Sequence, residues 1–192
     1  MNKYKIQTLN NISPKGLGRF PLERYEVASD LSEPDGLVLR SASLHGMAIP
    51  ASLKAVGRAG AGTNNIPVAE MSSQGVAVFN APGANANAVK ELVVTGMLLA
   101  ARNIIAAWDF VHGLDGDAEA MGQAVEAGKK QFKGFELPGR TLGVVGLGAI
   151  GARLARACQA LDLRVLGVRR DPSRPCEHAD EVHGVEALDE LL

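Results

Sequence analysis

Six residues in the second half of the chain have the types and spacing to hold a pyrophosphate. They form the pattern G-x-G-x-x-G, with glycines at 146, 148 and 151. Gly146 can make a tight turn, Gly148 lets the backbone approach phosphate oxygens without an intervening Cβ, and Gly151 lets a following helix pack closely on a sheet. The N–H groups at the start of that helix, around Ala149 and Ile150, would face the phosphates. The alternative is a glycine-rich turn that binds nothing.

The residues around this pattern predict the elements that position it. A β-branched apolar run begins at Thr141 and leads directly into the glycines. An amphipathic helix is predicted next, with Ile150, Leu154, Ala157 and Leu161 on its apolar face, and then a second strand over Leu163–Val168. A strand, glycine turn, helix and strand in this order is the context in which the pattern binds a dinucleotide.

Composition limits the remaining possibilities. The chain has 192 residues, 46% of them hydrophobic, and a formal net charge of −1. These values predict an ordinary globular protein of one or two domains that binds neither nucleic acid nor an anionic membrane. Cys158 and Cys176 make neither a disulfide framework nor a zinc site, and no metal site is expected.

The sequence also gives expectations about location. Its N-terminus has no apolar signal segment, and the longest apolar run, Leu92–Ala101, is too short to cross a bilayer. We therefore expect a cytoplasmic protein without a membrane segment.

The first eighty residues alternate short apolar runs with turn signals, which predicts a parallel α/β sheet. Short helices are expected at Ile49–Leu53 and Pro67–Ser73. The expected strands are Tyr4–Leu9, Tyr25–Ala28, Gly36–Arg40, Ala55–Ala59 and Val76–Asn80.

Two further helices are expected between this region and the glycine pattern. One runs from about Asn85 to Trp108, and the other covers Ala118–Phe132. The stretch Val89–Ile105 is apolar nearly all round, so it must be covered on every side. It is either a central core helix or a subunit interface.

Four segments together resemble the D-2-hydroxyacid dehydrogenase family, and most of all its D-3-phosphoglycerate dehydrogenase branch. The resemblance runs from Lys3 to about Val168. It implies a flavodoxin-like substrate domain, here residues 1–81, and a Rossmann nucleotide-binding domain, here residues 82–192. It also implies a homodimer formed through the helix at Ala84–Asn103. The segments are LRSASLH at 39–45, GRAGAGTNNIPV at 57–68, FNAPGANANAVKELV at 79–93 and GVVGLGAIG at 143–151.

The resemblance also implies a substrate site. Arg40 and Arg58 match basic residues that contact a substrate phosphate, and Ser41 belongs to the same site. A loop at Gly60-Ala61-Gly62 matches the backbone that holds the substrate carboxylate. A guanidinium fork suits both kinds of anion. The alternative is that both arginines are merely solvated strand ends. The four histidines match no catalytic position.

The second nucleotide strand departs from the family pattern. NAD-using members have an acidic residue after this strand, where this chain has Arg169 and Arg170, with Asp171 two places on. An arginine pair there can accept the 2′-phosphate of NADP. Alternatively, a shifted turn lets Asp171 contact the ribose. NAD is the expected cofactor, and NADP is the alternative.

The family's catalytic Arg, Glu and His would lie beyond Leu192, so the chain is expected to be an N-terminal fragment with about two strands of the nucleotide sheet. The implied reaction is oxidation of 3-phosphoglycerate to the 2-keto acid, the first step of serine synthesis. One alternative is a glyoxylate or hydroxypyruvate reductase of the same family. The other is a non-catalytic dinucleotide sensor, as in the related transcriptional corepressors.

Overall fold

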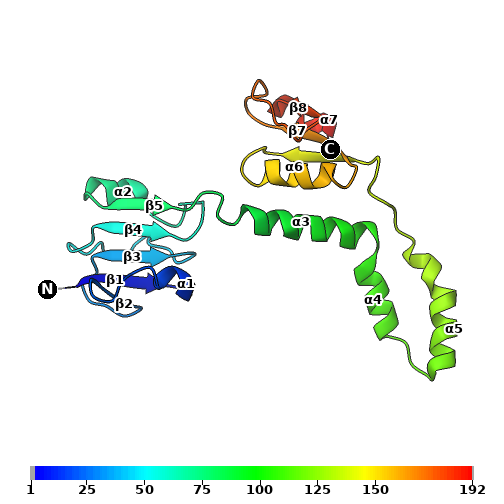
Figure 1. Cartoon of the computed structure of the whole chain (residues 1–192), viewed down its shortest axis with the longest axis horizontal. Coiled ribbons are helices and arrows are strands. Elements are labelled where there is room, and N and C mark those ends of the chain that lie inside the picture. The colour runs from blue at the N-terminus through cyan, green and yellow to red at the C-terminus, as the bar shows by residue number, and fades with distance from the viewer. Residues whose placement is uncertain (1–2, 192) are drawn as a thin grey trace. The chain divides into compact units, whose positions relative to one another are not determined.

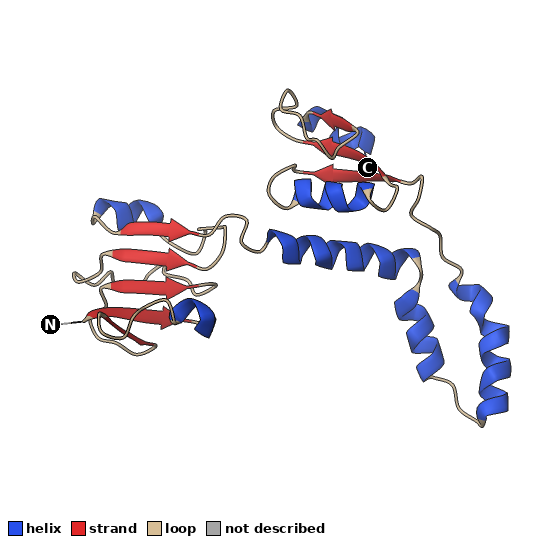
Figure 2. Ribbon diagram, viewed as in Figure 1, coloured by secondary structure: helices blue, strands red, loops and turns tan. Residues whose placement is uncertain are grey.

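The computed structural model describes residues 3–191. The chain separates into two compact units, Met1–Asn85 and Ala86–Leu192. Each contains a parallel sheet with helices (Figures 1 and 2).

The first unit is built on a five-stranded sheet in the order β2-β1-β3-β4-β5, with every pair parallel. This is the flavodoxin-like order, so the expected α/β class is confirmed. In such sheets ligands bind where the strand order reverses, which here is between β1 and β3. The strands are β1 (Tyr4–Leu9), β2 (Tyr25–Ala28), β3 (Gly36–Leu39), β4 (Ala55–Arg58) and β5 (Ala77–Asn80).

The centre of this sheet is apolar on the face that α2 (Val68–Ser73) packs against. Leu37, Leu39 and Val56 are almost fully buried, and Met71 of α2 packs into the same cluster. The other helix, α1 (Pro14–Leu17), follows β1. This core fixes the carboxyl ends of β3 and β4, where Arg40 and Arg58 lie.

The expected helix at Ile49–Leu53 is wrong. This segment is a turn in which the Leu53 N–H donates to the Pro50 carbonyl at 3.0 Å. The next residue is already extended, because the Lys54 N–H donates to the Asp35 carbonyl at 2.8 Å, and β4 follows at once. Strand β4 also ends at Arg58, one residue before the predicted end.

The second unit contains a three-stranded parallel sheet in the order β6-β7-β8. Its strands are β6 (Thr141–Val145), β7 (Arg164–Val168) and β8 (Glu181–His183), and α6 (Gly151–Gln159) connects the first two. Strand β8 was not expected, since its three residues show no apolar run. The short helices η2 (Val185–Ala187) and α7 (Leu188–Leu191) follow it.

The buried face of α6 agrees with the predicted one in part. Leu154, Ala155 and Cys158 are buried there, whereas Ile150 lies just before the helix and is 38% exposed. Leu154 is buried as predicted, and Leu161 packs against the cluster that these residues form, whereas Ile150 does not belong to the buried face and Ala155 does. Val93 and Met97 of α3 (Ala86–Ala101) pack against the same cluster.

The long helix expected from Asn85 to Trp108 is in fact two helices. Helix α3 ends at Ala101, α4 (Ile104–His112) follows, and the two are bent by 63°. Asn103 makes the break with a left-handed backbone (φ 51°), and its amide donates to the Lys133 carbonyl at 3.2 Å. No single helix in residues 3–191 is long and apolar enough to cross a bilayer, although α3 and α4 pass that test jointly by length and composition.

The predicted helix at Ala118–Phe132 is also divided, into α5 (Ala118–Gly128) and a 3₁₀ turn, η1 (Lys129–Phe132). The Asp117 carboxylate caps its start by accepting from the Ala120 N–H at 2.9 Å. The rings of Phe110 and Phe132 lie 5.1 Å apart and hold α4 against η1.

Candidate functional site

The first unit places two arginines next to each other at one edge of its sheet. Arg58 is the last residue of β4 and pairs in register with Leu39, the last residue of β3, which Arg40 follows. Because all the strands are parallel, their carboxyl ends meet at this edge. Arg40, Arg58 and Gly60 line one pocket of about 500 Å³, and its other walls come from Asn11, Ile12, Ser13, Ala59, Ala81, Ala84 and Asn85.

The side chain of Arg58 lies against the backbone of Gly60. A Cβ on Gly60 would overlap the guanidinium group, with Cζ only 2.8 Å away. The Nε of Arg58 is buried and has no hydrogen-bond partner among residues 3–191. A buried donor without an acceptor is costly, so this nitrogen is suited to an acceptor from a ligand.

The loop at Gly60-Ala61-Gly62 presents N–H groups rather than carbonyls. The Asn80 amide donates to the Ala61 carbonyl at 2.7 Å, and the Ala81 N–H donates to the Gly60 carbonyl at 2.9 Å. Since the carbonyl and the following N–H of a peptide point in opposite directions, the N–H groups of Ala61 and Gly62 turn away from β5. Neither N–H has an acceptor within the described part of the chain. Such a loop can hold an anion.

Sequence reasoning missed the asparagines of this edge. The Asn80 amide orients the loop at residues 60–62 by donating to the Ala61 carbonyl. The Asn10 side chain accepts a hydrogen bond from the Ser41 N–H at 2.9 Å. The Ser41 N–H is therefore not available to a ligand, and Ser41, which was predicted to belong to the substrate site, is not among the residues that line the pocket. The only signal in the sequence for these two residues was their position, because Asn80 ends one predicted strand and Asn10 directly follows another.

The glycine turn of the second unit has the geometry that its pattern predicts. Gly146 has φ +93°, and its N–H donates to the Val168 carbonyl at 2.8 Å, which joins β6 to β7. A Cβ on Gly151 would overlap the Gly146 carbonyl and lie 3.2 Å from Val144 Cγ1. A Cβ on Gly148 would meet nothing within 4 Å. Gly151 is thus required by packing, whereas the space over Gly148 is open.

The start of α6 leaves donors for a ligand. Its first hydrogen bonds run from the Ala152 N–H to the Gly148 carbonyl at 3.0 Å and from the Leu154 N–H to the Ile150 carbonyl at 2.9 Å. The N–H groups of Gly148, Ala149 and Ile150 have no acceptor in residues 3–191. With the open space over Gly148, they fit a pyrophosphate.

The loop after β7 is strongly basic. Arg169 donates from its backbone to the His183 carbonyl at 3.0 Å and from its guanidinium to the Arg174 carbonyl at 3.1 Å. The Asp171 carboxylate accepts from the Ser173 hydroxyl at 2.6 Å, and this hydrogen bond holds the pKa of Asp171 below its usual value. The charges of Arg174 and Arg169 also lower the pKa of Asp171, and Arg170 precedes it in the sequence. Three arginines therefore lie in the short segment around a carboxylate that already has a partner. Ser173 and Arg174 were not among the predicted residues.

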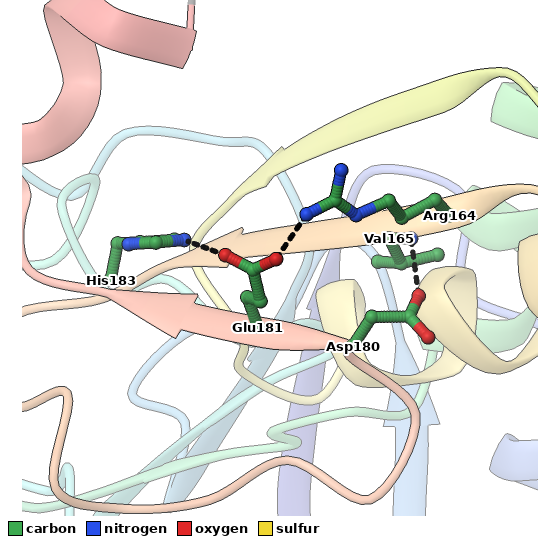
Figure 3. A network of polar contacts seen from close by, with 5 residues as sticks. All are labelled: Arg164, Val165, Asp180, Glu181 and His183. Carbon is green, nitrogen blue, oxygen red and sulfur yellow. Dashed lines mark hydrogen bonds and ion pairs between the residues drawn. The ribbon is translucent and has the colours of Figure 1, made fainter.

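A histidine and a glutamate also lie together, on β8. Figure 3 shows the Glu181 carboxylate between Arg164 of β7 and the ring of His183, with a His183 Nε2 to Glu181 Oε2 distance of 3.1 Å. The Arg164 hydrogen bond lowers the pKa of Glu181, so this carboxylate is a poor proton acceptor. Beside it, Asp180 accepts from the Val165 N–H at 2.6 Å. The network joins the two strands.

Among the residues that the structure describes, no three His, Cys, Asp or Glu side chains are placed to hold a metal ion. Burial raises the pKa of the Cys158 thiol, which makes it a poor nucleophile.

Two relatives show which proteins this chain is similar to. It is 36% identical over 173 residues to D-3-phosphoglycerate dehydrogenase of Methanocaldococcus jannaschii, covering 88% of this chain and 30% of that protein. It is 35% identical over 178 residues to hydroxypyruvate reductase of Thermotoga maritima, covering 91% of this chain and 54% of that protein. The chain thus spans about a third to a half of the length of these relatives.

The fold has a counterpart among solved structures. The NADPH-dependent glyoxylate/hydroxypyruvate reductase of Sinorhizobium meliloti matches with a TM-score of 0.73 at 22% identity, covering 94% of this chain and 58% of that one. The profile of the D-isomer specific 2-hydroxyacid dehydrogenase catalytic domain matches residues 5–188. Since that match takes in nearly all of both units, the chain belongs to the D-isomer specific 2-hydroxyacid dehydrogenase family.

Proposed function

We propose that this chain supplies the substrate-binding and dinucleotide-binding parts of a D-3-phosphoglycerate dehydrogenase. The reaction is oxidation of the C2 hydroxyl of 3-phosphoglycerate to a ketone. The observation that carries the proposal is the pairing of Arg40 with Arg58 on one pocket at the carboxyl edge of the first sheet. Two guanidinium groups on one small pocket favour a substrate that carries a multiply charged anionic group such as a phosphate.

The charges of the substrate fit the two kinds of donor at this edge. 3-Phosphoglycerate carries a phosphate at one end and a carboxylate at the other. Arg40 and Arg58 suit the phosphate, because guanidinium groups bind it with paired hydrogen bonds. The N–H groups of Ala61 and Gly62 suit the carboxylate. Binding both ends would orient the C2 hydroxyl between them.

The second unit would bind the oxidant, a nicotinamide adenine dinucleotide. Its pyrophosphate would lie on the N–H groups of Gly148, Ala149 and Ile150, in the space that Gly148 leaves open. When bound, this cofactor would supply the hydride acceptor for oxidation of the C2 hydroxyl. The role of this chain's own residues is to hold the two reactants and orient them.

A reductase acting on glyoxylate or hydroxypyruvate is the second candidate, and the loop after β7 favours it. Arg169, Arg170 and Arg174 offer three positive charges where a 2′-phosphate would lie, and Asp171 is already bonded to Ser173. This arrangement supports use of NADP(H), the cofactor of the Sinorhizobium meliloti reductase. Use of NAD would instead require the Asp171 carboxylate to give up its hydrogen bond with Ser173 and to accept from the ribose hydroxyls.

The test is a comparison of substrates with the whole protein that contains this chain. We expect a higher kcat/KM for oxidation of 3-phosphoglycerate than of glycerate, because only the former can use both arginines. A larger kcat/KM for reduction of unphosphorylated hydroxypyruvate than of its phosphorylated form would contradict the proposal and support the reductase. Dinucleotide binding without turnover of either substrate would support the non-catalytic sensor.

We also propose that two copies associate through α3 and α4. Val93 and Met97 of α3 pack inward, yet Leu92 is 72% exposed and Trp108 of α4 is 58% exposed. Ile105 lies on the surface of α4 as well. Sedimentation velocity should show a dimer that Leu92→Asp converts to a monomer. A monomeric wild-type protein would contradict this.

A further inference from the structure

The loop that carries Arg40 is held by an asparagine from the neighbouring strand. Asn10 follows β1 directly, as Arg40 follows β3, and Leu9 pairs with Leu39 in register. The Asn10 Oδ1 accepts from the Ser41 N–H at 2.9 Å and from the Ala42 N–H at 2.7 Å. One side-chain oxygen thus satisfies both backbone donors that follow Arg40.

The backbone of Asn10 is adapted to this contact. Its φ is +71°, in the left-handed region that glycine and asparagine tolerate best. The conformation aims the side chain at the β3 loop across the point where the strand order reverses. Glycine could adopt the same backbone but would lack the acceptor.

A second asparagine holds the same loop through its carbonyls. The Asn65 Nδ2 donates to the Ala42 carbonyl at 2.7 Å and, at 3.4 Å, to the Arg40 carbonyl. The Asn65 carbonyl also accepts from the N–H of the fully buried Leu44 at 2.9 Å. Between Leu39 and Leu44 the loop is therefore fixed at both ends and in the middle.

The two side chains act through opposite halves of the amide. Asn10 uses only its oxygen, as an acceptor, whereas Asn65 uses only its nitrogen, as a donor. The Oδ1 of Asn65 is buried without a partner among the described residues. Between them they satisfy the N–H groups of Ser41 and Ala42 and the carbonyls of Arg40 and Ala42. The Arg40 side chain is left to line the pocket.

From this arrangement we infer that Asn10 and Asn65 are positioning residues, which fix the loop after β3 so that Arg40 meets the substrate phosphate without reorganisation. The inference rests on the proposed function for the identity of that substrate. The fixing of the loop itself does not. A preorganised charged group binds more tightly because less conformational freedom is lost on binding.

The same substitution at the two positions separates this role from general stability. Asn10→Asp keeps an acceptor for the two N–H groups, whereas Asn10→Gly keeps the backbone and removes the acceptor. Asn65→Asp instead places a carboxylate against two carbonyls. We expect Asn10→Asp to hold the loop as the wild type does, and hydrogen exchange is its readout because the added negative charge acts on KM by itself. Asn10→Gly and Asn65→Asp should raise the KM for 3-phosphoglycerate about tenfold or more, with a much smaller change in kcat.

A control variant tests whether the backbone alone matters. Asp162 also has a left-handed backbone, with φ 57°, and its side chain makes no hydrogen bond in the described structure. Asp162→Gly therefore relieves the same kind of backbone strain as Asn10→Gly, but it removes no side-chain hydrogen bond. This variant, in the second unit, should leave the KM for 3-phosphoglycerate unchanged. An equal KM increase in Asp162→Gly and Asn10→Gly would overturn the inference.

Amide hydrogen exchange of the chain separates failure of this inference from failure of the proposed function. The Ser41 and Ala42 N–H groups should exchange faster in Asn10→Gly than in the wild type, and Asn10→Asp should restore their protection. Unchanged protection in Asn10→Gly would overturn the inference whatever the substrate is. Changed protection together with no selective effect of Arg40→Ala on 3-phosphoglycerate would instead refute the proposed function.

Discussion

The guanidinium group of Arg58 occupies the space that a Cβ on Gly60 would need. Gly60→Ala should therefore push the guanidinium out of the pocket and weaken the binding of a phosphorylated substrate. We expect the KM for 3-phosphoglycerate to rise about tenfold, since one charge-assisted contact is lost or distorted. Gly122→Ala is the matched control, because a Cβ at that position of α5 meets nothing within 4 Å. An unchanged KM in Gly60→Ala would show that Arg58 does not bind the phosphate from its present position.

Gly148 and Gly151 should separate stability from dinucleotide binding. Gly151→Ala overlaps the Gly146 carbonyl, so it should lower the free energy of unfolding by about 1–3 kcal/mol. Gly148→Ala meets open space and should leave unfolding nearly unchanged, but its methyl group would occupy the place of the pyrophosphate. Urea unfolding and a fluorescence titration with NADH and NADPH measure the two effects. An unchanged affinity of Gly148→Ala for both dinucleotides would contradict the proposal that the pyrophosphate binds at this turn.

The loop after β7 should set the choice of cofactor. Arg169→Asp removes one positive charge and adds a carboxylate where NAD-using members of the family have one. The ratio of kcat/KM for NADP to that for NAD should fall about tenfold or more, because a charge-assisted contact contributes about 1.5–3 kcal/mol. If the unaltered protein already strongly prefers NAD, Asp171 is the ribose ligand and the arginines do not bind a 2′-phosphate.

The Glu181–Arg164 ion pair should make the junction of β7 and β8 sensitive to acid. Arg164 lowers the pKa of Glu181 in the folded protein. The Glu181 carboxylate therefore binds a proton more readily in the unfolded state than in the folded state. The ion pair contributes its full stability above the ordinary glutamate pKa, and this contribution is lost as the pH falls through the pKa of Glu181 in the folded protein. Glu181→Gln should lower the urea midpoint at neutral pH and have no effect at a pH below the folded-state pKa of Glu181. Equal effects at both pH values would contradict this.

Much of the fold follows from local patterns in the sequence. The strands of the first sheet were predicted within a residue or so, because short apolar runs such as Gly36–Leu39 are bounded by turn residues. The turn at Gly146–Gly151 was predicted because its three glycines meet three different steric requirements within one short segment of the sequence. The break at Asn103 was not predicted, since it depends on contacts with residues 132–135 that are distant in sequence.

The polar frame around the candidate site could not be predicted for the same reason. Asn10, Asn65 and Asn80 act on loops between 19 and 32 residues away along the chain. No local pattern indicates which backbone group an exposed asparagine will meet. The arginines were identified from a family resemblance, whereas their pairing in one pocket came from the register of β3 and β4.

The selectivity of Arg40 for the phosphorylated substrate tests the central claim most directly. Arg40→Ala in the whole protein should lower kcat/KM for 3-phosphoglycerate by about tenfold or more, the effect of losing a charge-assisted contact of about 1.5–3 kcal/mol. The kcat/KM for an unphosphorylated 2-hydroxy acid such as glycerate should change far less, because that substrate has no phosphate for Arg40 to contact. The account predicts this difference between the two substrates. Equal losses on both would contradict it.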